Sequence, residues 1–566
     1  MTLPESPAPT PARSLWRRDL LLLALACVVF FGFRLGSYPL ANPDEGRNAE
    51  IPREMLAADE WVTPQLNGVN YFEKPPLVYW AVAVLEKTFG LNEWAVRAVP
   101  ALFALAGVLI TYAAARRLYG RNAGLAAAAV LGTALLYCGM ARFLVLDMAV
   151  SVLMSATLFC FIIAVQEPPG TKRRWLFYGL YASAALATLT KGFIGFLVTG
   201  AVMFLWLLIF NQWKRLRPLH LPTGLLLFLA IALPWHVLAA LRNETWAHRY
   251  IYFEHWERFF TTAHGRVQPW YFFIGIVLAG FFPWSAFLWP AVRAAVRGGW
   301  ARRQENATAW FFVTWTAFIF LFFSASHSKL VPYILPIFPA LAVLVGAWLA
   351  EAIADHSGAA RLRVGLRIYS FASGLLAVAL IVVVAKAGII RDAWQIEALR
   401  WPAIGLAVVL LAGGIVGPAL TRTRGALAGV TTIVVSLVVF LLGLTFAAPN
   451  IQKPGTKELA AIVQAGVRPG DRVVHYHDFF HDFTFYTQRV VDVVGTKGEL
   501  ELEEDAAARA SGRFYDDAEF RRRWEGPERL WVVARKRDTK ELFADPAFHY
   551  RLLGEGRDHY LFTNRP

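Results

Sequence analysis

The sequence predicts a mostly α-helical, polytopic membrane protein of about thirteen transmembrane helices, followed by a small C-terminal α/β domain. Of its 566 residues, 57% are hydrophobic and only 17% are charged, whereas soluble domains average about 25% charged residues. Basic residues recur in every second short loop between apolar runs, which is the pattern of the positive-inside rule. After Ala447 the long apolar runs stop and shorter, more polar segments begin. These three observations define the expected fold class.

Each expected span is a mostly apolar run close to the roughly 20 residues that cross a bilayer. The first run, "LLLALACVVFFGF", follows Arg17 and Arg18 but has no small-residue cleavage pattern after it, so we interpret it as a retained span and not as a signal peptide. The expected spans are residues 19–36, 94–115, 123–140, 143–165, 175–190, 192–210, 221–240, 270–291, 309–324, 331–350, 364–386, 402–420 and 426–447.

The basic loops set the expected orientation. With the N-terminus in the cytoplasm, each cytoplasmic loop carries at least two basic residues, and an odd number of spans places the C-terminus on the opposite face. The net charge of +15 suits anionic lipid. A nucleic-acid partner is not favoured, because the positive charges lie in short loops between spans. These loop residues are Arg116, Arg117 and Arg121; Lys172, Arg173 and Arg174; Lys214, Arg215 and Arg217; Arg293, Arg297, Arg302 and Arg303; Arg361, Arg363 and Arg367; and Arg422 and Arg424.

Residues 448–566 are expected to form a separate α/β domain outside the cytoplasm, and residues 1–447 the membrane domain. The runs "RVVHYHDFF", "RVVDVV" and "RLWVVARK" are short and rich in β-branched residues, which is typical of strands. The segments "KELAAIVQAG" and "DAEFRRRWEG" have the spacing of helices.

The first outer loop, residues 37–93, is expected to hold two amphipathic helices lying at the membrane interface. Asp44 and Glu45 follow Pro43, so they fall in the first turn of a helix, where the helix dipole favours carboxylates. An ordinary capped surface helix would explain one such acid. It would not explain why further charges such as Arg47 continue beside apolar bulk, so the cluster is a functional hypothesis.

Two further pairs of charged residues admit two interpretations each. Glu73 and Lys74 precede a Pro-Pro break. Lys74 could bind a lipid phosphate as a compact charge, or it could be a lysine whose side chain reaches the interface. Arg142 and Asp147 lie near the outer end of a span, and they could be functional or a structural ion pair.

The loop 241–269 is rich in histidine, acids and arginine. Arg258 and Arg266, flanked by aromatic residues, suit a phosphate site because guanidinium groups donate in pairs. His255 stands beside Glu254 and could contribute to a metal site. A solvated helical face is the competing interpretation.

Lys329 and Tyr333 are four residues apart, which would put both on one helix face, although Pro332 weakens a helix there. His475 belongs to the His-rich run "HYHDFFH", a composition that can bind zinc but that equally suits the polar residues of a strand and loop. A zinc site from Glu73, His255 and His475 is therefore an open possibility, although the chemistry below requires no cofactor.

The expected topology places several cations on one face, around the acids of the first loop. These cations are Lys74, Lys191, Arg258, Arg266 and Lys329. Cations that hold phosphate oxygens and stabilise a leaving group, together with a carboxylate that orients or deprotonates an acceptor, are what phosphate-linked group transfer requires. No Gly-rich phosphate loop is evident, so a soluble nucleotide-sugar donor is not favoured.

The chain resembles the lipid A aminoarabinose transferases, integral-membrane glycosyltransferases of the GT-C type. The resemblance rests on "PDEGRNAEIPREMLAADEWVTPQLNGVNYFEKPPLVYW", "ARFLVLDM", "LTKGFIGF", "YFEHWERFF" and "SKLVPYILPIFPALA". It implies an undecaprenyl-phosphate-linked aminosugar donor and a lipid A acceptor, with transfer at the periplasmic face of the bacterial inner membrane and resistance to polymyxin and other cationic peptides.

The resemblance also implies roles for particular residues. Asp44 matches the catalytic carboxylate of the family, and Asp147 matches a second aspartate. Lys74, Arg258 and Tyr333 match the contacts to the carrier-lipid phosphate. To this set we add three further candidate phosphate contacts: Arg47, Lys329 and Arg266.

The sequence departs from the family pattern at two places. Asn48 stands where the family has tyrosine, and the segment Ser328 to Tyr333 differs from the family's G-K-L-P-T-Y. The main alternative is a protein O-mannosyltransferase, which would use a polyprenyl-phosphate-mannose donor and a peptide acceptor. A flippase or transporter is less favoured, because the sequence shows neither internal repeats nor charges deep in the apolar runs.

Overall fold

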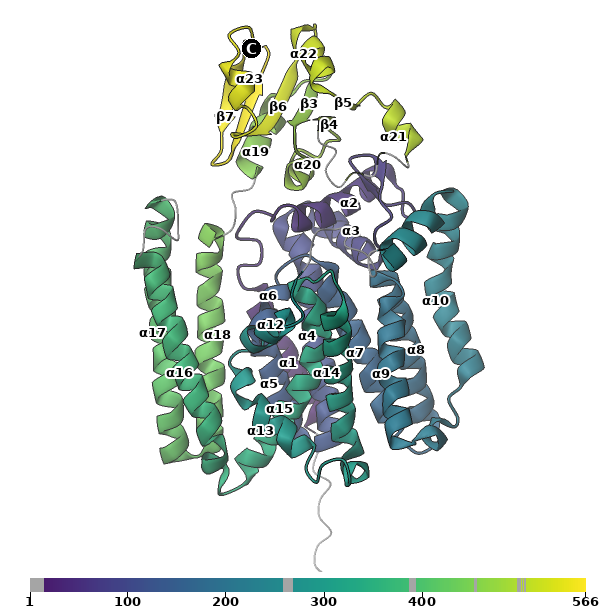
Figure 1. Ribbon diagram of the computed structural model, residues 1–566, viewed down its shortest axis with the longest axis vertical. Coiled ribbons are helices and arrows are strands. Elements are labelled where there is room, and N and C mark those ends of the chain that lie inside the picture. The colour runs from purple at the N-terminus through teal and green to yellow at the C-terminus, as the bar shows by residue number, and fades with distance from the viewer. Residues whose placement is uncertain are drawn as a thin grey trace, which may run out of the picture.

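The structure is a computed structural model that describes residues 15–257, 268–385, 393–451, 456–495, 500, 502 and 505–565, with backbone alone at 253–257, 393–394 and 451. A bundle of long helices forms the larger part, and a sheet domain built from the C-terminal segment sits over one end of it (Figure 1). Helices α2 and α3 lie across that end, between the bundle and the sheet domain (Figure 1).

The bundle is built from fifteen α-helices and five shorter helical turns among the described residues. The α-helices are α1 (Trp16–Gly32), α4 (Glu93–Tyr119), α5 (Arg121–Thr133), α6 (Leu135–Met140), α7 (Leu146–Ala164), α8 (Thr171–Lys191), α9 (Ile194–Phe210), α10 (Leu221–Arg242), α12 (Phe272–Gly280), α13 (Leu288–Ala295), α14 (Ala307–Ala325), α15 (Phe338–Ala354), α16 (Gly358–Ala385), α17 (Ala393–Arg424) and α18 (Ala426–Ile451). The turns are η1 (Trp213–Leu216), the π-helix η2 (His248–Glu257), η3 (Trp284–Phe287), η4 (Arg303–Asn306) and η5 (Val331–Ile337).

The predicted multi-pass membrane class is confirmed. In the described part of the chain, eight helices are long and apolar enough to cross a membrane, or nine if the pair Phe272–Gly280 and Trp284–Ala295, bent by 101°, is one span. Each of the predicted span ranges contains a helix, but α1 and α9 have only 17 residues and α5 only 13. The total of thirteen spans therefore stays a prediction.

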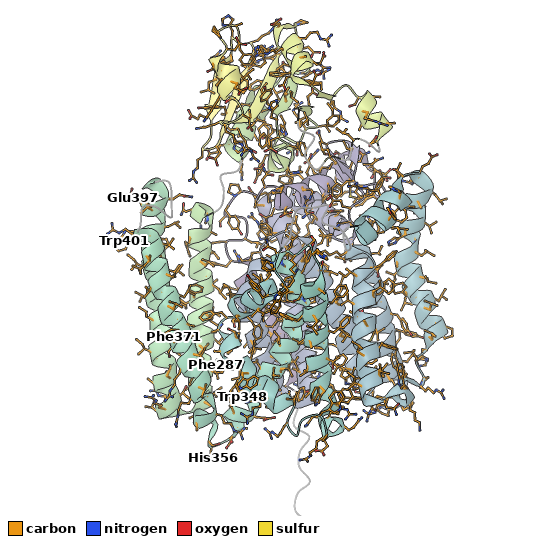
Figure 2. The ribbon with its side chains drawn as sticks, viewed as in Figure 1. Phe287, Trp348, His356, Phe371, Glu397 and Trp401 are labelled. Carbon is orange, nitrogen blue, oxygen red and sulfur yellow. The ribbon has the colours of Figure 1, made fainter. Side chains whose placement is uncertain are left out.

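The side chains of the bundle separate into an apolar interior and an apolar exterior. Phe287 and Trp348 pack in the interior with ring centroids 6.1 Å apart, whereas Phe371 on α16 and Trp401 on α17 point outward (Figure 2) and are 74% and 73% exposed. Large apolar side chains exposed over long helices indicate a surface that contacts lipid.

The first loop forms the layer between the bundle and the sheet domain. It consists of α2 (Asp44–Ala58), a hairpin of β1 (Gln65–Leu66) with β2 (Val69–Asn70), and α3 (Leu77–Phe89). Both predicted helices are present. Most of α2 is buried, however, because the C-terminal domain covers it.

The C-terminal domain is a six-stranded mixed sheet with strand order β5-β4-β3-β6-β8-β7. Strands β3, β4, β5 and β6 pair in parallel, and β7 and β8 add an antiparallel edge. The predicted strands and helices are present, and the final antiparallel pair adds to them. The strands are β3 (Arg472–Tyr476), β4 (Asp492–Val494), β5 (Phe514–Tyr515), β6 (Leu530–Arg535), β7 (Arg551–Glu555) and β8 (His559–Thr563), and the helices are α19 (Lys457–Gly466), α20 (His481–Thr487), α21 (Ala506–Ala510), α22 (Asp517–Glu525) and α23 (Lys540–Ala544).

One hydrophobic core joins the first loop to this domain. Ala49 and Met55 of α2 belong to the same buried cluster as Phe483 and Val491 of the sheet domain. Two hydrogen bonds also join the first loop to the domain. Asn67 Nδ2 donates to the Val491 carbonyl over 3.0 Å, and the Val491 N–H donates back to Asn67 Oδ1 over 2.8 Å. The domain therefore packs against the first loop as part of one folded body.

A buried charge cluster lies between α2 and α3. Arg53 donates twice to Glu50, at 2.7 Å in each bond, and Glu54 accepts the backbone N–H groups of Asn67 and Gly68 at 2.6 and 2.8 Å. Glu86 of α3 is 2% exposed, and neither of its carboxyl oxygens has a hydrogen-bond partner. Burial, and next the charge of Glu50, raise the pKa of Glu86 well above its usual value.

Glu86→Gln is expected to flatten the pH dependence of stability. Because the folded protein holds the Glu86 proton more tightly than the unfolded chain, the contribution of Glu86 to stability is greatest below the ordinary pKa of 4.5 and is lost as pH rises towards the raised value. One such group contributes a slope of at most about 1.4 kcal/mol per pH unit. Thermal unfolding of both proteins between pH 4.5 and 8 measures the difference. The control is Glu525→Gln at an exposed site, and parallel curves for wild type and Glu86→Gln would contradict the expectation.

Candidate active site

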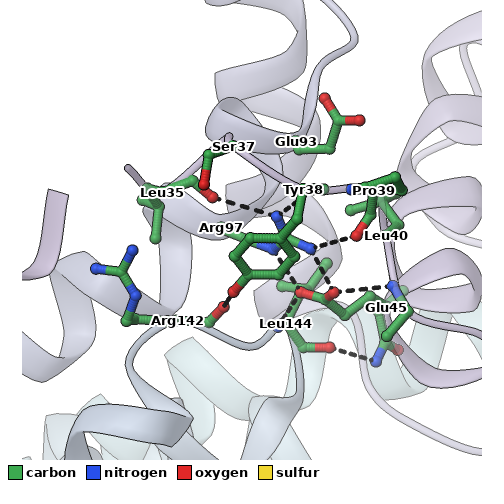
Figure 3. A network of polar contacts seen from close by, with 12 residues as sticks. Leu35, Ser37, Tyr38, Pro39, Leu40, Glu45, Glu93, Arg97, Arg142 and Leu144 are labelled. Carbon is green, nitrogen blue, oxygen red and sulfur yellow. Dashed lines mark hydrogen bonds and ion pairs between the residues drawn. The ribbon is translucent and has the colours of Figure 1, made fainter. Parts of the chain in front are cut away.

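The acids of the first loop have different environments, and Glu45, like Glu50, is fully buried. Glu45 and Arg97 of α4 are both fully buried and form two hydrogen bonds, of 2.8 and 2.7 Å. The other Arg97 donors reach backbone carbonyls of the segment that leads into α2 (Figure 3), namely those of Leu35, Tyr38 and Pro39. Glu45 thus anchors α2 to the bundle.

The same helix also fixes the turn that precedes α7. Glu45 Oε1 accepts the Leu144 N–H over 3.1 Å (Figure 3), and Asn48 Nδ2 donates to the Leu144 carbonyl over 3.1 Å. Both backbone groups of Leu144 are therefore bound to α2, just before the helix turn that carries Asp147. Asn48, the position that departs from the family pattern, takes part in this contact.

Asp44 is the exception among the acids at the start of α2. Its side chain is 47% exposed and pairs with Arg47 at 2.6 Å. The Arg47 side chain is only 12% exposed, but a pair three residues apart with one exposed partner contributes little to stability. The carboxylate of Asp44 is thus accessible, whereas the carboxylate of its neighbour Glu45 is buried in an ion pair with Arg97.

Arg142 and Asp147 do not form the ion pair considered above. Arg142 donates to the carbonyls of Phe31 and Phe33 over 2.9 and 2.5 Å, because the last carbonyls of α1 lack partners within the helix and carry its negative dipole end. Asp147 instead pairs with Lys191, the last residue of α8, at 2.5 Å.

A cavity of about 690 Å³ lies beside this pair, between α7, α9, α14 and η5. Its walls are mostly apolar, with residues such as Val150, Leu197 and Phe322. Its polar lining residues are Glu73, Lys74, Asp147, Lys191, Tyr252, Ser326, Ser328 and Tyr333. The cavity thus combines apolar walls with two lysines, as a lipid phosphate would require.

Lys191 is the central cation of this cavity. Besides its bond to Asp147, its Nζ lies 4.6 Å from the centre of the Tyr333 ring, a distance at which a cation is attracted to an aromatic face. Lys74 Nζ lies 3.9 Å from Glu73 Oε2. The cavity therefore brings together four of the predicted site residues, Glu73, Lys74, Asp147 and Tyr333, with Lys191.

Other predicted residues lie elsewhere. Asp44, Arg47 and Lys329 are not among the residues that line the cavity. Lys329 is 5% exposed and donates to the carbonyls of Gln268 and Ser326, at 3.0 and 2.5 Å, and its burial lowers its pKa. The expectation that it shares a helix face with Tyr333 was wrong, because η5 begins only at Val331 and Lys329 precedes it in an irregular segment.

His475 lies in the core of the C-terminal domain, packed against Phe479, Phe480 and Phe483. Its Nδ1 accepts the Phe480 N–H over 3.2 Å, and burial lowers its pKa to about 3. Across the described residues, no group of three or more His, Cys, Asp or Glu side chains is arranged to hold a metal ion. Arg258, Arg266 and the side chain of His255 lie outside what the structure describes, so the zinc site remains untested.

Some contacts of the site have no signal in the sequence. Glu45 and Arg97 are 52 residues apart, and Asp147 and Lys191 are 44 apart. Tyr252 of η2 lines the cavity but looks in the sequence like any aromatic residue of its loop. Only the packing of the helices reveals these neighbours.

Comparison with known proteins identifies the family of the chain. The dolichyl-phosphate-mannose-protein mannosyltransferase family matches residues 73–237. The chain is 31% identical over 411 residues to the undecaprenyl phosphate-alpha-4-amino-4-deoxy-L-arabinose arabinosyl transferase of Erwinia tasmaniensis, covering 70% of this chain and 72% of the relative.

A second relative aligns over a shorter part of its length. The undecaprenyl phosphate-alpha-4-amino-4-deoxy-L-arabinose arabinosyl transferase 2 of Sodalis glossinidius is 32% identical over 331 residues. The alignment covers 58% of this chain and 59% of that relative, so the chain spans less than two thirds of the relative's length. The crystal structure of ArnT from Cupriavidus metallidurans bound to undecaprenyl phosphate has a TM-score of 0.86 at 27% identity and covers 98% of this chain and 99% of that one. With this fold, the chain belongs to the undecaprenyl phosphate-alpha-4-amino-4-deoxy-L-arabinose arabinosyl transferase family.

Proposed function

We propose that the protein transfers 4-amino-4-deoxy-L-arabinose from undecaprenyl phosphate to phosphate groups of lipid A. The observation that carries this proposal is the largely apolar cavity of about 690 Å³ in which Lys74, Lys191 and Tyr333 meet. An apolar cavity suits a polyprenyl chain, and two ammonium groups beside a phenol suit its phosphate. The family of the chain supports the same donor.

In the proposed mechanism, Lys74, Lys191 and Tyr333 hold the phosphate of the donor lipid, and Arg258 adds a further cation. An oxygen of the lipid A phosphate attacks the anomeric carbon while the bond from that carbon to the carrier phosphate breaks. The electron pair of the broken bond passes to undecaprenyl phosphate, whose growing charge the cations stabilise. A single displacement of this kind inverts the anomeric carbon. Asp147 keeps Lys191 in place through their 2.5 Å contact.

Asp44 is proposed to position the reacting groups. A lipid A phosphate is already ionised near neutral pH, so little deprotonation is needed. The exposed carboxylate of Asp44 can attract the amine of the sugar or orient the acceptor. Arg47, its ion-pair partner, and Arg266 are proposed to bind acceptor or donor phosphate, whereas the buried contacts of Lys329 favour a structural role for that residue.

No metal is required in this mechanism, because lysine and arginine side chains supply the positive charge. Zinc held by Glu73, His255 and His475 is the alternative, and metal analysis of the purified protein distinguishes the two. We further propose that the N-terminus faces the cytoplasm of the bacterial inner membrane and the C-terminal domain faces the periplasm. Transfer there lowers the negative charge of lipid A and so protects against polymyxin and other cationic peptides.

Protein O-mannosylation is the second candidate function. It is supported by the match of residues 73–237 to the dolichyl-phosphate-mannose-protein mannosyltransferase family. Both reactions would use a lipid phosphate donor in the same cavity, so the two candidates differ in the sugar and in the acceptor. A flippase or transporter is less favoured, because the sequence shows neither internal repeats nor charges deep in the apolar runs.

Mass spectrometry of lipid A from cells with and without the gene tests the proposal. The expected result is an aminoarabinose substituent on lipid A phosphate that disappears with the gene and returns when the gene is restored. Glycoproteins from the same cells are analysed in parallel. Unchanged lipid A with altered glycoproteins would replace the proposed function by protein O-mannosylation.

A further inference from the structure

The C-terminal domain touches the chain beside Asp44, and this contact suggests a role for the domain. We infer that Asn42 and Asp482 form a clamp through which the C-terminal domain positions the first turn of α2, and with it the carboxylate of Asp44. The inference rests on the proposed function in one respect: it takes Asp44 as the residue that orients the reacting groups. Asn42 and Asp482 are then positioning residues.

The clamp is reciprocal. Asn42 Nδ2 donates to Asp482 Oδ1, and the Asp482 N–H donates to Asn42 Oδ1 over 3.2 Å. The second carboxyl oxygen of Asp482 accepts the Thr456 N–H over 2.9 Å. Asp482 is fully buried, and a hydrogen bond to a buried charged group contributes more than one between neutral groups. The contact therefore holds the chain two residues before Asp44 in a fixed place.

Gly46 brings α2 against the same point of the domain. A Cβ atom at this position would lie 2.5 Å from the Asp482 backbone nitrogen and 2.8 Å from the His481 carbonyl carbon. Real Cβ atoms do not approach backbone this closely, so a larger residue here must push α2 and the domain apart. Asp44 thus lies between a clamped residue and a glycine in close backbone contact.

A second set of bonds holds the chain just before the clamp. The Leu40 N–H donates to the Tyr486 hydroxyl over 2.8 Å, and that hydroxyl donates to Glu93 over 2.9 Å. Lys457 of α19 pairs with the same carboxylate at 2.5 Å. Leu40 and Asn42, which lie just before α2, are therefore both bound to the C-terminal domain. The Asp44 side chain itself stays accessible.

The expected consequence of loosening the clamp is a loss of rate and not of donor binding. A misplacement of about 1 Å at a catalytic group can reduce the rate about 10²-fold. The residues proposed to hold the donor phosphate, such as Lys191 and Tyr333, lie on other elements. Variants of the clamp should therefore lower kcat and leave KM for the donor nearly unchanged.

The test uses the full-length protein and a swap of the two side chains. Asn42→Asp alone places two carboxylates against each other. Asp482→Asn alone offers one neutral acceptor oxygen in place of two charged ones, so either the Thr456 N–H or the Asn42 amide loses its acceptor. The double variant Asn42→Asp with Asp482→Asn restores an amide facing a carboxylate. We expect each single variant to lower kcat by about 10–100-fold, with donor KM changed less than about twofold, and the double variant to recover most of the rate.

Gly46→Ala provides an independent variant, and Gly374→Ala in α16 is its control, because a Cβ there meets nothing within 4 Å. Gly46→Ala should lower kcat and the control should not. Single variants with wild-type kcat, or a double variant that stays as slow as the single ones, would overturn the inference.

Hydrogen–deuterium exchange of the amides of residues 44–50 separates this inference from the proposed function. The wild-type rate of aminoarabinose transfer tests the function by itself. If the wild type transfers no aminoarabinose, the inference still requires faster exchange at the start of α2 in the single variants and protection restored in the double variant. Unchanged exchange in the single variants would overturn it.

Discussion

Asp44→Asn is expected to lower the transfer rate by about 10²-fold or more while the protein stays folded. The substitution keeps the shape of the side chain but removes the charge that orients the sugar amine or the acceptor. Its cost in stability is small, because the Asp44 side chain is 47% exposed and its ion pair with Arg47 spans one helix turn. The measurement is kcat for aminoarabinose transfer together with thermal unfolding in detergent.

Asp59→Asn is the matched control, since Asp59 lies just past the other end of α2 in a left-handed conformation that asparagine tolerates. It should transfer at the wild-type rate. Full activity of Asp44→Asn would remove Asp44 from the mechanism. A large loss of thermal stability in that variant would instead assign the residue a structural role.

Glu45→Gln, by contrast, is expected to destabilise the fold, with a loss of about 3–5 kcal/mol of unfolding free energy. Glu45 and Arg97 are both fully buried and joined by two hydrogen bonds. Glutamine leaves the Arg97 guanidinium buried without its counter-charge, and its amide N–H groups face arginine donors. The Leu144 N–H also loses its carboxylate acceptor. Thermal or chemical unfolding and the yield of folded protein measure the effect.

Glu305→Gln is the control for this prediction, because Glu305 forms the same two-bond contact with Arg302 at the surface, over 2.9 and 2.7 Å. There the side chain is 56% exposed, and exposed pairs of this kind contribute little to stability, so Glu305→Gln should unfold close to the wild type. Equal losses in Glu45→Gln and Glu305→Gln would show that burial does not set the energy of the Arg97 contact.

These two predictions separate neighbouring acids that look alike in the sequence. Asp44 and Glu45 both fall in the first turn of a predicted helix, and nothing in their spacing distinguishes them. Glu45 faces Arg97 of the bundle, whereas Asp44 faces outward. The difference arises because adjacent residues on a helix point in different directions, and the sequence does not say which direction meets the bundle.

Much of the fold could be predicted because its causes are local. Apolar runs long enough to cross a bilayer, basic residues in alternate loops and β-branched runs after Ala447 identify the membrane helices and the sheet domain. The first-loop helices also follow from local pattern. The prediction of where helices begin was wrong where the local pattern is ambiguous. Lys329 and Tyr333 have helical spacing in the sequence, but the helical turn begins only at Val331.

The candidate site was only partly predictable. The lysine and tyrosine motifs suggested phosphate binding, and the structure places Lys74, Tyr333 and Lys191 around one cavity. Of the two interpretations of Arg142 and Asp147, the ion pair between them is not formed, because Arg142 donates to the carbonyls at the end of α1 and Asp147 pairs with Lys191. Which of several possible partners a charge selects depends on the three-dimensional packing.

The sequence by itself determined that this is a multi-pass membrane protein with a C-terminal α/β domain, and it singled out the charged first loop. Only the tertiary structure decided which acid of that loop is structural and which is accessible, and that the C-terminal domain contacts it. Asn42 and Asp482 are 440 residues apart, so no local pattern relates them. Length and polarity of a segment are local properties, whereas the partner of a buried charge is fixed only when distant segments pack together.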